Sequence, residues 1–307
     1  VVNSVYSIGY MRGNREKHQT RFYTCFAIAL SAAMGVAFAG NLLTLFLFYE
    51  ILTLATYPLV AHKGDAATIR SARVYLGILI FASIGLLLPA IVWTYMIAGT
   101  GDFTPGGILE GRLDGPQVGL LLALFVFGAA KAAVMPVHRW LPAAMVAPTP
   151  VSALLHAVAV VKAGVFVVTK VIVYVFGIDF LFAEPSSGWL SYAAAFTIIM
   201  ASLVALRQKN LKRLLAYSTI GQLSYVIMAS AILKPLAEVG AAIHMVAHAF
   251  GKITLFFAAG AIYTASKKTE IGQLRGIGRR MPLTMTAFTI GALSMIGVPP
   301  TGGFVSK

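Results

Sequence analysis

The segment FGAAKAAVMPVHRWLPAAMVAPTPVSALLHAVAVVKAG, residues 127–164, carries the strongest indications of the fold class of this chain. It is mostly apolar, as a membrane span is, yet it contains four prolines, two lysines and two histidines. Proline inside a helix removes a backbone hydrogen bond and clashes with the preceding turn, so we predict a helix break between Met135 and Pro142. Non-helical backbone at membrane depth persists only where it is buried in protein or lines a wet cavity, and transporters build ion sites in this way. The residues concerned are Pro136, Pro142, Pro148, Pro150, Lys131, His138, His156 and Lys162.

The composition is that of an integral membrane protein. Of the 307 residues, 59% are hydrophobic and 11% are charged, whereas soluble domains are about 45–50% apolar and about 25% charged. Because a membrane span takes about 20 residues, the chain has room for several helices. We therefore predict an all-α polytopic membrane protein packed as one helix bundle. The single cysteine, Cys25, excludes a disulfide framework and any cysteine-ligated zinc or iron–sulfur site within this chain.

Apolar windows between polar loops predict nine spans. Residues 1–10 resemble the end of an earlier span, and no signal peptide is visible. The chain opens without Met and stops shortly after a Pro-Pro pair, so we expect an internal portion of a longer membrane protein. The predicted spans are 22–39, 42–61, 74–98, 117–134, 149–176, 189–206, 214–232, 238–263 and 283–298.

The charges separate into two sets of loops. If the chain crosses at each span, one set of loops holds 17 of the 24 Lys and Arg, and six of the ten carboxylates lie on the opposite side. The positive-inside rule then predicts cytoplasmic basic loops, in the inner membrane of a bacterial or archaeal cell. The formal net charge of +14 therefore reflects topology, and we expect no nucleic-acid partner. The basic loops are 11–21, 62–73, 135–148, 207–213 and 264–282.

One carboxylate, five lysines and three histidines remain at membrane depth. Each ionisable group there costs about 2.5–3.5 kcal/mol on insertion scales, so such a set marks an ion or proton path. The alternative for a lysine near a helix end is snorkelling to water, which fits Lys170 best. The complete set is Glu50, Lys131, Lys162, Lys170, Lys252, Lys307, His156, His244 and His248.

Glu50 lies near the middle of the predicted span 42–61, where its side chain has no route to water. A buried carboxylate keeps its charge only beside a cation, and another helix must supply that cation. Lys131 is the obvious candidate, and a purely structural ion pair is the alternative.

The histidines follow helical spacings. His244, His248 and Lys252 recur every four residues, which places all three on one face of a helix. Two histidines at this spacing can bind zinc, but no glutamate follows the first and no third ligand is evident. A stripe of proton carriers is the favoured interpretation, because imidazole titrates near neutral pH. Ordinary core histidines are the alternative, for His156 as for the other two.

Two halves of the chain match in hydropathy and in the position of their breaks. The spans from 22 onward begin on the basic side, whereas those from 189 onward begin on the other. In each half the fourth span is interrupted by proline close to a lysine: Pro136 near Lys131, and Pro300 near Lys307. An inverted-topology repeat predicts this pattern, with 22–176 as the first copy and 189–307 as a truncated second copy.

Five stretches together resemble a known family, the antiporter-like proton-channel subunits shared by respiratory complex I, Mrp-type sodium/proton antiporters and membrane-bound hydrogenases. Members have a roughly fourteen-helix fold, so the resemblance implies a fragment from the fourth helix to the break in the twelfth. Residues 55–76, ATYPLVAHKGDAATIRSARVYL, are most similar to the D-type subunits of Mrp antiporters, although Ala143 stands where many members have aspartate. The stretches are LFLFYEILTLATYPLVAH (45–62), WLPAAMVAPTPVSALLHAVAVVKAG (140–164), RQKNLKRLLAYSTIGQLSYV (207–226), HMVAHAFGKITLFFAAG (244–260) and GVPPTGGFVSK (297–307).

The resemblance implies a role in proton translocation for each matched residue. Glu50 matches the glutamate of the family's fifth helix, and Lys131 matches the seventh-helix lysine that pairs with it. The remaining matches are Lys162 to the eighth-helix lysine, His156 to a histidine of the conduction path, His244, His248 and Lys252 to the eleventh-helix stripe, and Lys307 to the twelfth-helix lysine.

The sequence thus predicts a proton-translocating subunit of a cation/proton antiporter or of a redox-driven pump. The chain holds no flavin, haem, iron–sulfur or nucleotide motif, so we expect no cofactor, no active site of its own, and other membrane subunits as partners. Whether it serves an NADH:quinone oxidoreductase-type translocase, and whether sodium moves as well, stays open. A stand-alone secondary transporter of another substrate is the alternative, but it would not need so many titratable groups at mid-depth. A structural membrane subunit would lack Glu50 and the lysines.

Overall fold

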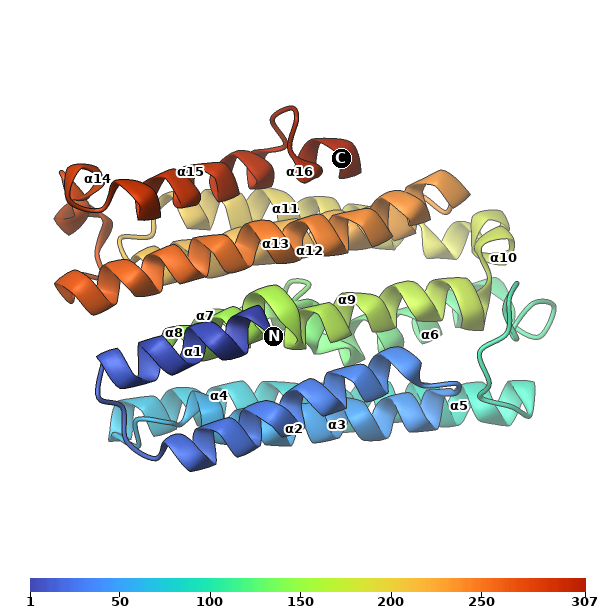
Figure 1. Ribbon diagram of the computed structural model, residues 1–307. Coiled ribbons are helices and arrows are strands. Elements are labelled where there is room, and N and C mark those ends of the chain that lie inside the picture. Colours follow the sequence, from blue (N-terminus) through green and yellow to red (C-terminus); the bar gives the residue numbers. More distant parts are fainter.

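The computed structural model describes all 307 residues and is built from helices, with two isolated β-bridges as its only extended pairing. The helices run side by side across the view in Figure 1, and their loops gather at its two ends. The first half of the chain contains α1 (Val2–Gly13), α2 (Gln19–Phe38), α3 (Leu42–Val60), α4 (Ala66–Ala82), η1 (Ser83–Leu87), α5 (Leu88–Ala98), α6 (Gly115–Gly128), η2 (Ala130–Ala132), η3 (Val137–Arg139), α7 (Trp140–Ala143), η4 (Ala144–Val146), α8 (Thr149–Ala153), η5 (Leu154–Val158), α9 (Val160–Val171) and η6 (Ile172–Phe176). The second half contains α10 (Ile178–Ala183), η7 (Pro185–Ser187), α11 (Trp189–Leu206), α12 (Leu211–Ala231), α13 (Pro235–Ser266), η8 (Ile271–Leu274), α14 (Ile277–Arg280), α15 (Pro282–Ile296) and α16 (Gly302–Ser306).

Seven helical stretches are long and apolar enough to cross a membrane, and each matches a predicted span. The two remaining predicted spans are the shorter apolar helices α6 and α15. Both end at an interruption of the helix, which is why neither reaches full span length. The all-α polytopic fold class is therefore confirmed.

The two halves contact one another through a few central helices. In the first half α2 packs along α3, and in the second half α11 packs along α12. Helix α9 lies between the halves and contacts both α2 and α12, while α13 contacts α8 and η5 (Figure 1). The ionisable residues of α9 and α13 are therefore carried by the helices that join the halves.

The predicted helix break between Met135 and Pro142 is present, but the interruption begins earlier, at the end of α6. Helix α6 already ends at Gly128, and Ala133 has a positive φ of 59°. Gly128 lies so close to the turn at Leu87 that a Cβ there would meet the Leu87 nitrogen at 2.5 Å. Helix α6 thus ends before any proline is reached, at a glycine that lets it pack closely against η1.

Side chains from other segments satisfy the backbone groups freed at the break. The Tyr49 hydroxyl accepts from the Lys131 amide at 3.2 Å, and the Trp140 indole donates to the Ala130 carbonyl at 2.8 Å. The Thr197 hydroxyl accepts from the Met135 amide at 3.2 Å. Since unsatisfied backbone groups are costly in a membrane, these contacts are what make the break stable.

Candidate functional site

The Lys131 side chain is fully buried and is held by α3. Its Nζ donates to the backbone carbonyl of Tyr49 at 2.8 Å and to the Thr53 hydroxyl at 2.6 Å. The same ammonium lies 3.0 Å from the centroid of the Tyr49 ring. The hydroxyl of Thr53 donates in turn to the Tyr49 carbonyl at 3.1 Å. Two neutral groups of α3, the Tyr49 carbonyl and the Thr53 hydroxyl, thus bind the Lys131 ammonium.

The predicted contact between Glu50 and Lys131 is absent. No lysine or arginine lies within 4.0 Å of a carboxylate in this chain, and the Glu50 Oε1 atom is buried without a hydrogen-bond partner. Glu50 lies three residues before Thr53 on α3, so its carboxylate and the Thr53 hydroxyl project from neighbouring positions of the helix, yet Glu50 forms no ion pair with Lys131. Its negative charge acts on Lys131 from beyond contact distance.

The Lys162 ammonium and the Nδ1 atom of His248 are hydrogen-bonded, which links α9 directly to α13. His248 is fully buried, and its second ring nitrogen has no partner. His156 is also fully buried, in the π-helical segment η5; neither of its ring nitrogens has a partner, and its ring lies 5.2 Å from that of Phe256. Lys162 and His248 therefore meet, whereas His156 and Lys162 do not bond.

The stripe on α13 is buried as the spacing predicts, and α12 supplies two of its four hydrogen-bond partners. Lys252 donates to the Ser218 hydroxyl at 2.8 Å. The two ring nitrogens of His244 bond the Gln222 side chain at 3.1 Å and the Ser306 hydroxyl at 2.8 Å. Since each histidine of the stripe has its own separate partners, the two imidazoles do not converge on a common ligand position.

Lys307 lies at the end of the second broken helix. Its Nζ donates to the Met295 carbonyl at 2.8 Å and lies 4.8 Å from the centroid of the Tyr225 ring. That ring in turn lies 6.3 Å from the imidazole of His244, so Lys307 adjoins the stripe without bonding to it.

Lys170 does not snorkel freely as predicted. Its Nζ donates to the Ala39 carbonyl at 2.6 Å and lies 4.2 Å from the centroid of the Phe103 ring. Ala39 follows the last residue of α2, where backbone carbonyls have no partner within the helix. The lysine therefore ties the end of α2 to α9.

Sequence reasoning missed the neutral residues that hydrogen-bond Lys131, Lys252 and His244. Tyr49 and Ser218 both lie eight residues after the asparagine that caps their helix, and Thr53 and Gln222 both lie twelve residues after it. The two helices therefore carry these polar residues at the same distances from the capping asparagine. The sequence reveals the match only once the two asparagines are known to be equivalent.

The two asparagines, Asn41 and Asn210, occupy equivalent positions in a repeated backbone pattern. Each caps its helix and forms an isolated β-bridge with the segment after the third helix of its half, Asn41 with Asp102 and Asn210 with Glu270. The flanking hydrogen bonds also correspond: Leu42 to Gly101 at 2.9 Å and Phe103 to Gly40 at 3.1 Å, against Leu211 to Thr269 at 3.0 Å and Ile271 to Lys209 at 2.9 Å. The two junctions lie at opposite ends of the bundle (Figure 1).

A second missed feature is a hydrogen-bonded chain across three helices. The hydroxyls of Thr169 in α9 and Ser230 in α12 are 3.0 Å apart, and Ser230 donates to the Glu238 carboxylate of α13 at 3.1 Å. The other Glu238 oxygen is buried without a partner. Thr169 lies two helical turns from Lys162 on the same face of α9. Two hydroxyl groups thus connect α9 to a carboxylate on α13.

The family described as "NADH:quinone oxidoreductase/Mrp antiporter, TM" matches residues 39–307. The chain belongs to this family. It is 35% identical to NADH-quinone oxidoreductase subunit N of Desulforudis audaxviator (strain MP104C), covering 99% of this chain and 60% of that protein. It is 34% identical to a probable K(+)/H(+) antiporter subunit of Rhizobium meliloti (strain 1021), covering 100% of this chain and 30% of that protein.

Solved structures agree with this membership of the NADH:quinone oxidoreductase/Mrp antiporter family. A chain in the membrane-bound sulfane sulfur reductase, an archaeal respiratory membrane complex, superposes with a TM-score of 0.83 at 30% identity, covering 93% of this chain and 58% of that one. The present chain therefore spans about 60% or less of the length of these relatives. The predicted resemblance and the integral membrane character are confirmed, while the assignment to the D-type Mrp subunits stays a prediction.

Proposed function

We propose that this chain is the proton-translocating segment of a subunit in a hetero-oligomeric membrane complex, either a cation/proton antiporter or a redox-driven pump. The observation that carries the proposal is the hydrogen bond between Lys162 and His248. This bond joins a lysine of the first half of the chain to the stripe formed by His244, His248 and Lys252 in the second half. Both bonded groups are titratable and lie inside the bundle. The proteins named above are subunits of larger assemblies by their descriptions, which does not favour the stand-alone transporter.

The proposed route starts at Lys131, where the proton is stored on an ammonium held by neutral acceptors. Glu50 sets how tightly the proton is held, by charge at a distance. From Lys131 the proton passes by His156 and water to Lys162, and then through His248 and Lys252 to Lys307. Because imidazole can accept and donate at its two nitrogens, the unpartnered nitrogens of His156 and His248 are the positions at which water would bridge the route.

The proposal includes an inverted repeat of 22–176 and 189–307. The matching junctions at Asn41 and Asn210 support it, as do the interruptions after α6 and α15. It also includes cytoplasmic basic loops and a bacterial or archaeal inner membrane, supported by the separation of charge between the loops. Energy from redox chemistry would come from partner subunits.

The test compares Lys162→Met with wild type in the full-length protein, assembled with its partner subunits in vesicles. Methionine keeps the apolar stem and removes the titratable group, so we expect proton flux, followed with an entrapped pH dye, to fall at least about tenfold. Lys209→Met, an exposed lysine of a basic loop, is the matched control and should retain flux. Normal flux in an assembled Lys162→Met complex would refute the proposal.

A further inference from the structure

A basic pocket lies at the end of the bundle where the α3–α4 loop and the segment after α13 meet. Its volume is about 220 Å³, and its lining includes the three lysines Lys63, Lys212 and Lys268 and no carboxylate. The hydroxyl-bearing residues Tyr10, Thr149, Tyr263 and Thr269 also line it. Three cations beside several hydrogen-bond donors, without a counter-charge, form a site that requires an anion.

Lys212 is the cation that the fold positions within this pocket. It lies in the first turn of α12 and donates one hydrogen bond, to the Ala147 carbonyl at 2.6 Å. An ammonium group has three donors, so two remain for a ligand in the pocket. The helical stretches that begin at Thr149 and at Leu211 both start at this pocket, and the positive ends of their dipoles favour an anion there.

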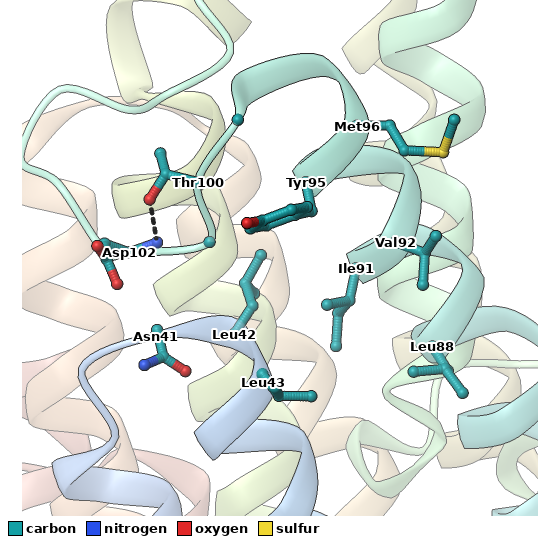
Figure 2. A pocket seen from close by; sticks show the side chains of 12 residues that line it. Asn41, Leu42, Leu43, Leu88, Ile91, Val92, Tyr95, Met96, Thr100 and Asp102 are labelled. Atoms are coloured by element: carbon teal, nitrogen blue, oxygen red, sulfur yellow. Dashed lines mark hydrogen bonds between the residues drawn. The ribbon is translucent and has the colours of Figure 1, made fainter.

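The equivalent pocket in the first half has the opposite character. Figure 2 shows it beside Asn41, where Leu43 stands at the position that corresponds to Lys212. Its lining is mainly apolar, it contains Asp102, and it contains no lysine. Two junctions with the same backbone pattern thus carry different side chains, so the basic lining is a property of these residues and not of the fold.

We propose that the pocket lined by Lys63, Lys212 and Lys268 binds a phosphate group, carried by an anionic phospholipid or free in solution. Basic pockets between transmembrane helices bind anionic headgroups, because the lysines neutralise the phosphate at the membrane surface. Met145, Val146 and Leu211 line the same pocket and supply apolar surface beside the charge. The inference does not depend on proton transport.

The experiment uses the full-length protein in its complex, in detergent micelles, with three probes. Dioleoylphosphatidylglycerol and dioleoylphosphatidylcholine are counted by native mass spectrometry, and inorganic phosphate is followed by equilibrium dialysis. The test variant is Lys63→Gln with Lys268→Gln. The control is Lys209→Gln with Arg275→Gln, which removes two exposed charges outside the pocket.

We expect phosphatidylglycerol to bind more tightly than phosphatidylcholine, and the test variant to weaken it by about thirtyfold, since each lysine contributes on the order of fivefold. The control should change binding less than about threefold. Lysine-dependent binding of inorganic phosphate alone would identify free phosphate as the ligand. Equal losses in the test and control variants, or binding of no probe that depends on Lys63 and Lys268, would overturn the proposal. Lys212→Gln is a second variant for the same measurement, with folding checked by its unfolding temperature.

Discussion

The Nζ atom of Lys131 lies 2.8 Å from the backbone carbonyl oxygen of Tyr49, inside a helix whose carbonyls already have backbone partners. A carbonyl oxygen has two lone pairs, so it can accept from a helix amide and from the lysine together. The cation is therefore anchored on α3 without a carboxylate. The position of Lys131 is set by Tyr49 and Thr53, and Glu50 is left to act through charge alone.

Thr53→Val should impair proton transport. Valine has nearly the shape of threonine but removes the hydroxyl that accepts from Lys131 at 2.6 Å. Hydrogen bonds to charged groups contribute about 1.5–3 kcal/mol, so we expect proton flux in vesicles to fall about tenfold. Thr53→Ser keeps the hydroxyl and should retain most of the flux. Thr24→Val, at an exposed threonine whose hydroxyl bonds only its own helix, is the control. Full activity in Thr53→Val would show that this contact does not position the lysine.

Lys131 should couple more strongly to Thr53 than to Glu50. Groups in contact show interaction energies of about 0.5–3 kcal/mol in double-mutant cycles, whereas separated groups are nearly additive. We expect the Lys131→Met/Thr53→Val cycle to exceed about 1 kcal/mol in proton flux, and the Lys131→Met/Glu50→Gln cycle to be smaller. A larger coupling to Glu50 would mean that the two side chains meet during transport.

Lys170→Met should lower stability while leaving transport close to normal. The substitution removes the hydrogen bond to the Ala39 carbonyl at the end of α2, and we expect a loss of about 1 kcal/mol in the free energy of unfolding. The measurement is the unfolding transition of the purified protein in detergent. Lys209→Met, which removes an exposed charge, should leave that transition unchanged. A severe transport defect with normal stability would instead place Lys170 on the proton route.

Ser230→Ala should slow proton movement between α9 and the Glu238 carboxylate. Ser230 is the middle group of the chain that begins at Thr169, so alanine interrupts both of its hydrogen bonds. We expect proton flux to fall several-fold, by about 1 kcal/mol in activation free energy. Ser191→Ala is the matched control, because it removes a single bond to the Ala231 carbonyl at the same end of the bundle. Equal flux in the two variants would assign the chain of hydroxyls a purely structural role.

His62 should make the contact between the basic loops 11–21 and 62–73 sensitive to acid. Burial lowers the pKa of the His62 imidazole, and the nearby Arg21 cation lowers this pKa further. The unfolded chain takes up the proton near pH 6.5 and the folded chain at lower pH, so stability falls as pH drops from about 6.5 toward the folded pKa. The unfolding temperature, measured between about pH 5 and 7.5, should depend less on pH in His62→Gln. An unchanged pH dependence would show that the pKa of His62 is the same in the folded and unfolded states.

The fold class, the spans and most of the ionisable residues inside the bundle were predictable from the sequence, although Glu238 was not among them. Hydropathy reports directly which segments can cross a membrane, because the free energy of transfer is a sum over residues. It even separated α6 and α15 from the other spans as the two helices next to breaks. The spacing of His244, His248 and Lys252 placed them correctly on one buried face, since a helix repeats every 3.6 residues.

Which groups bind one another follows from the packing of the helices and could not be predicted. The end of α6 at Gly128, and the choice of the Tyr49 carbonyl and the Thr53 hydroxyl as partners of Lys131, are seen only in the packed bundle. Opposite charge in the sequence pointed to Glu50, but an ammonium can be satisfied by a carbonyl and a hydroxyl, and Lys131 binds these instead. Contacts between helices depend on how each helix is rotated about its axis and on how closely two helices approach. The hydrophobic periodicity of a single helix gives neither quantity.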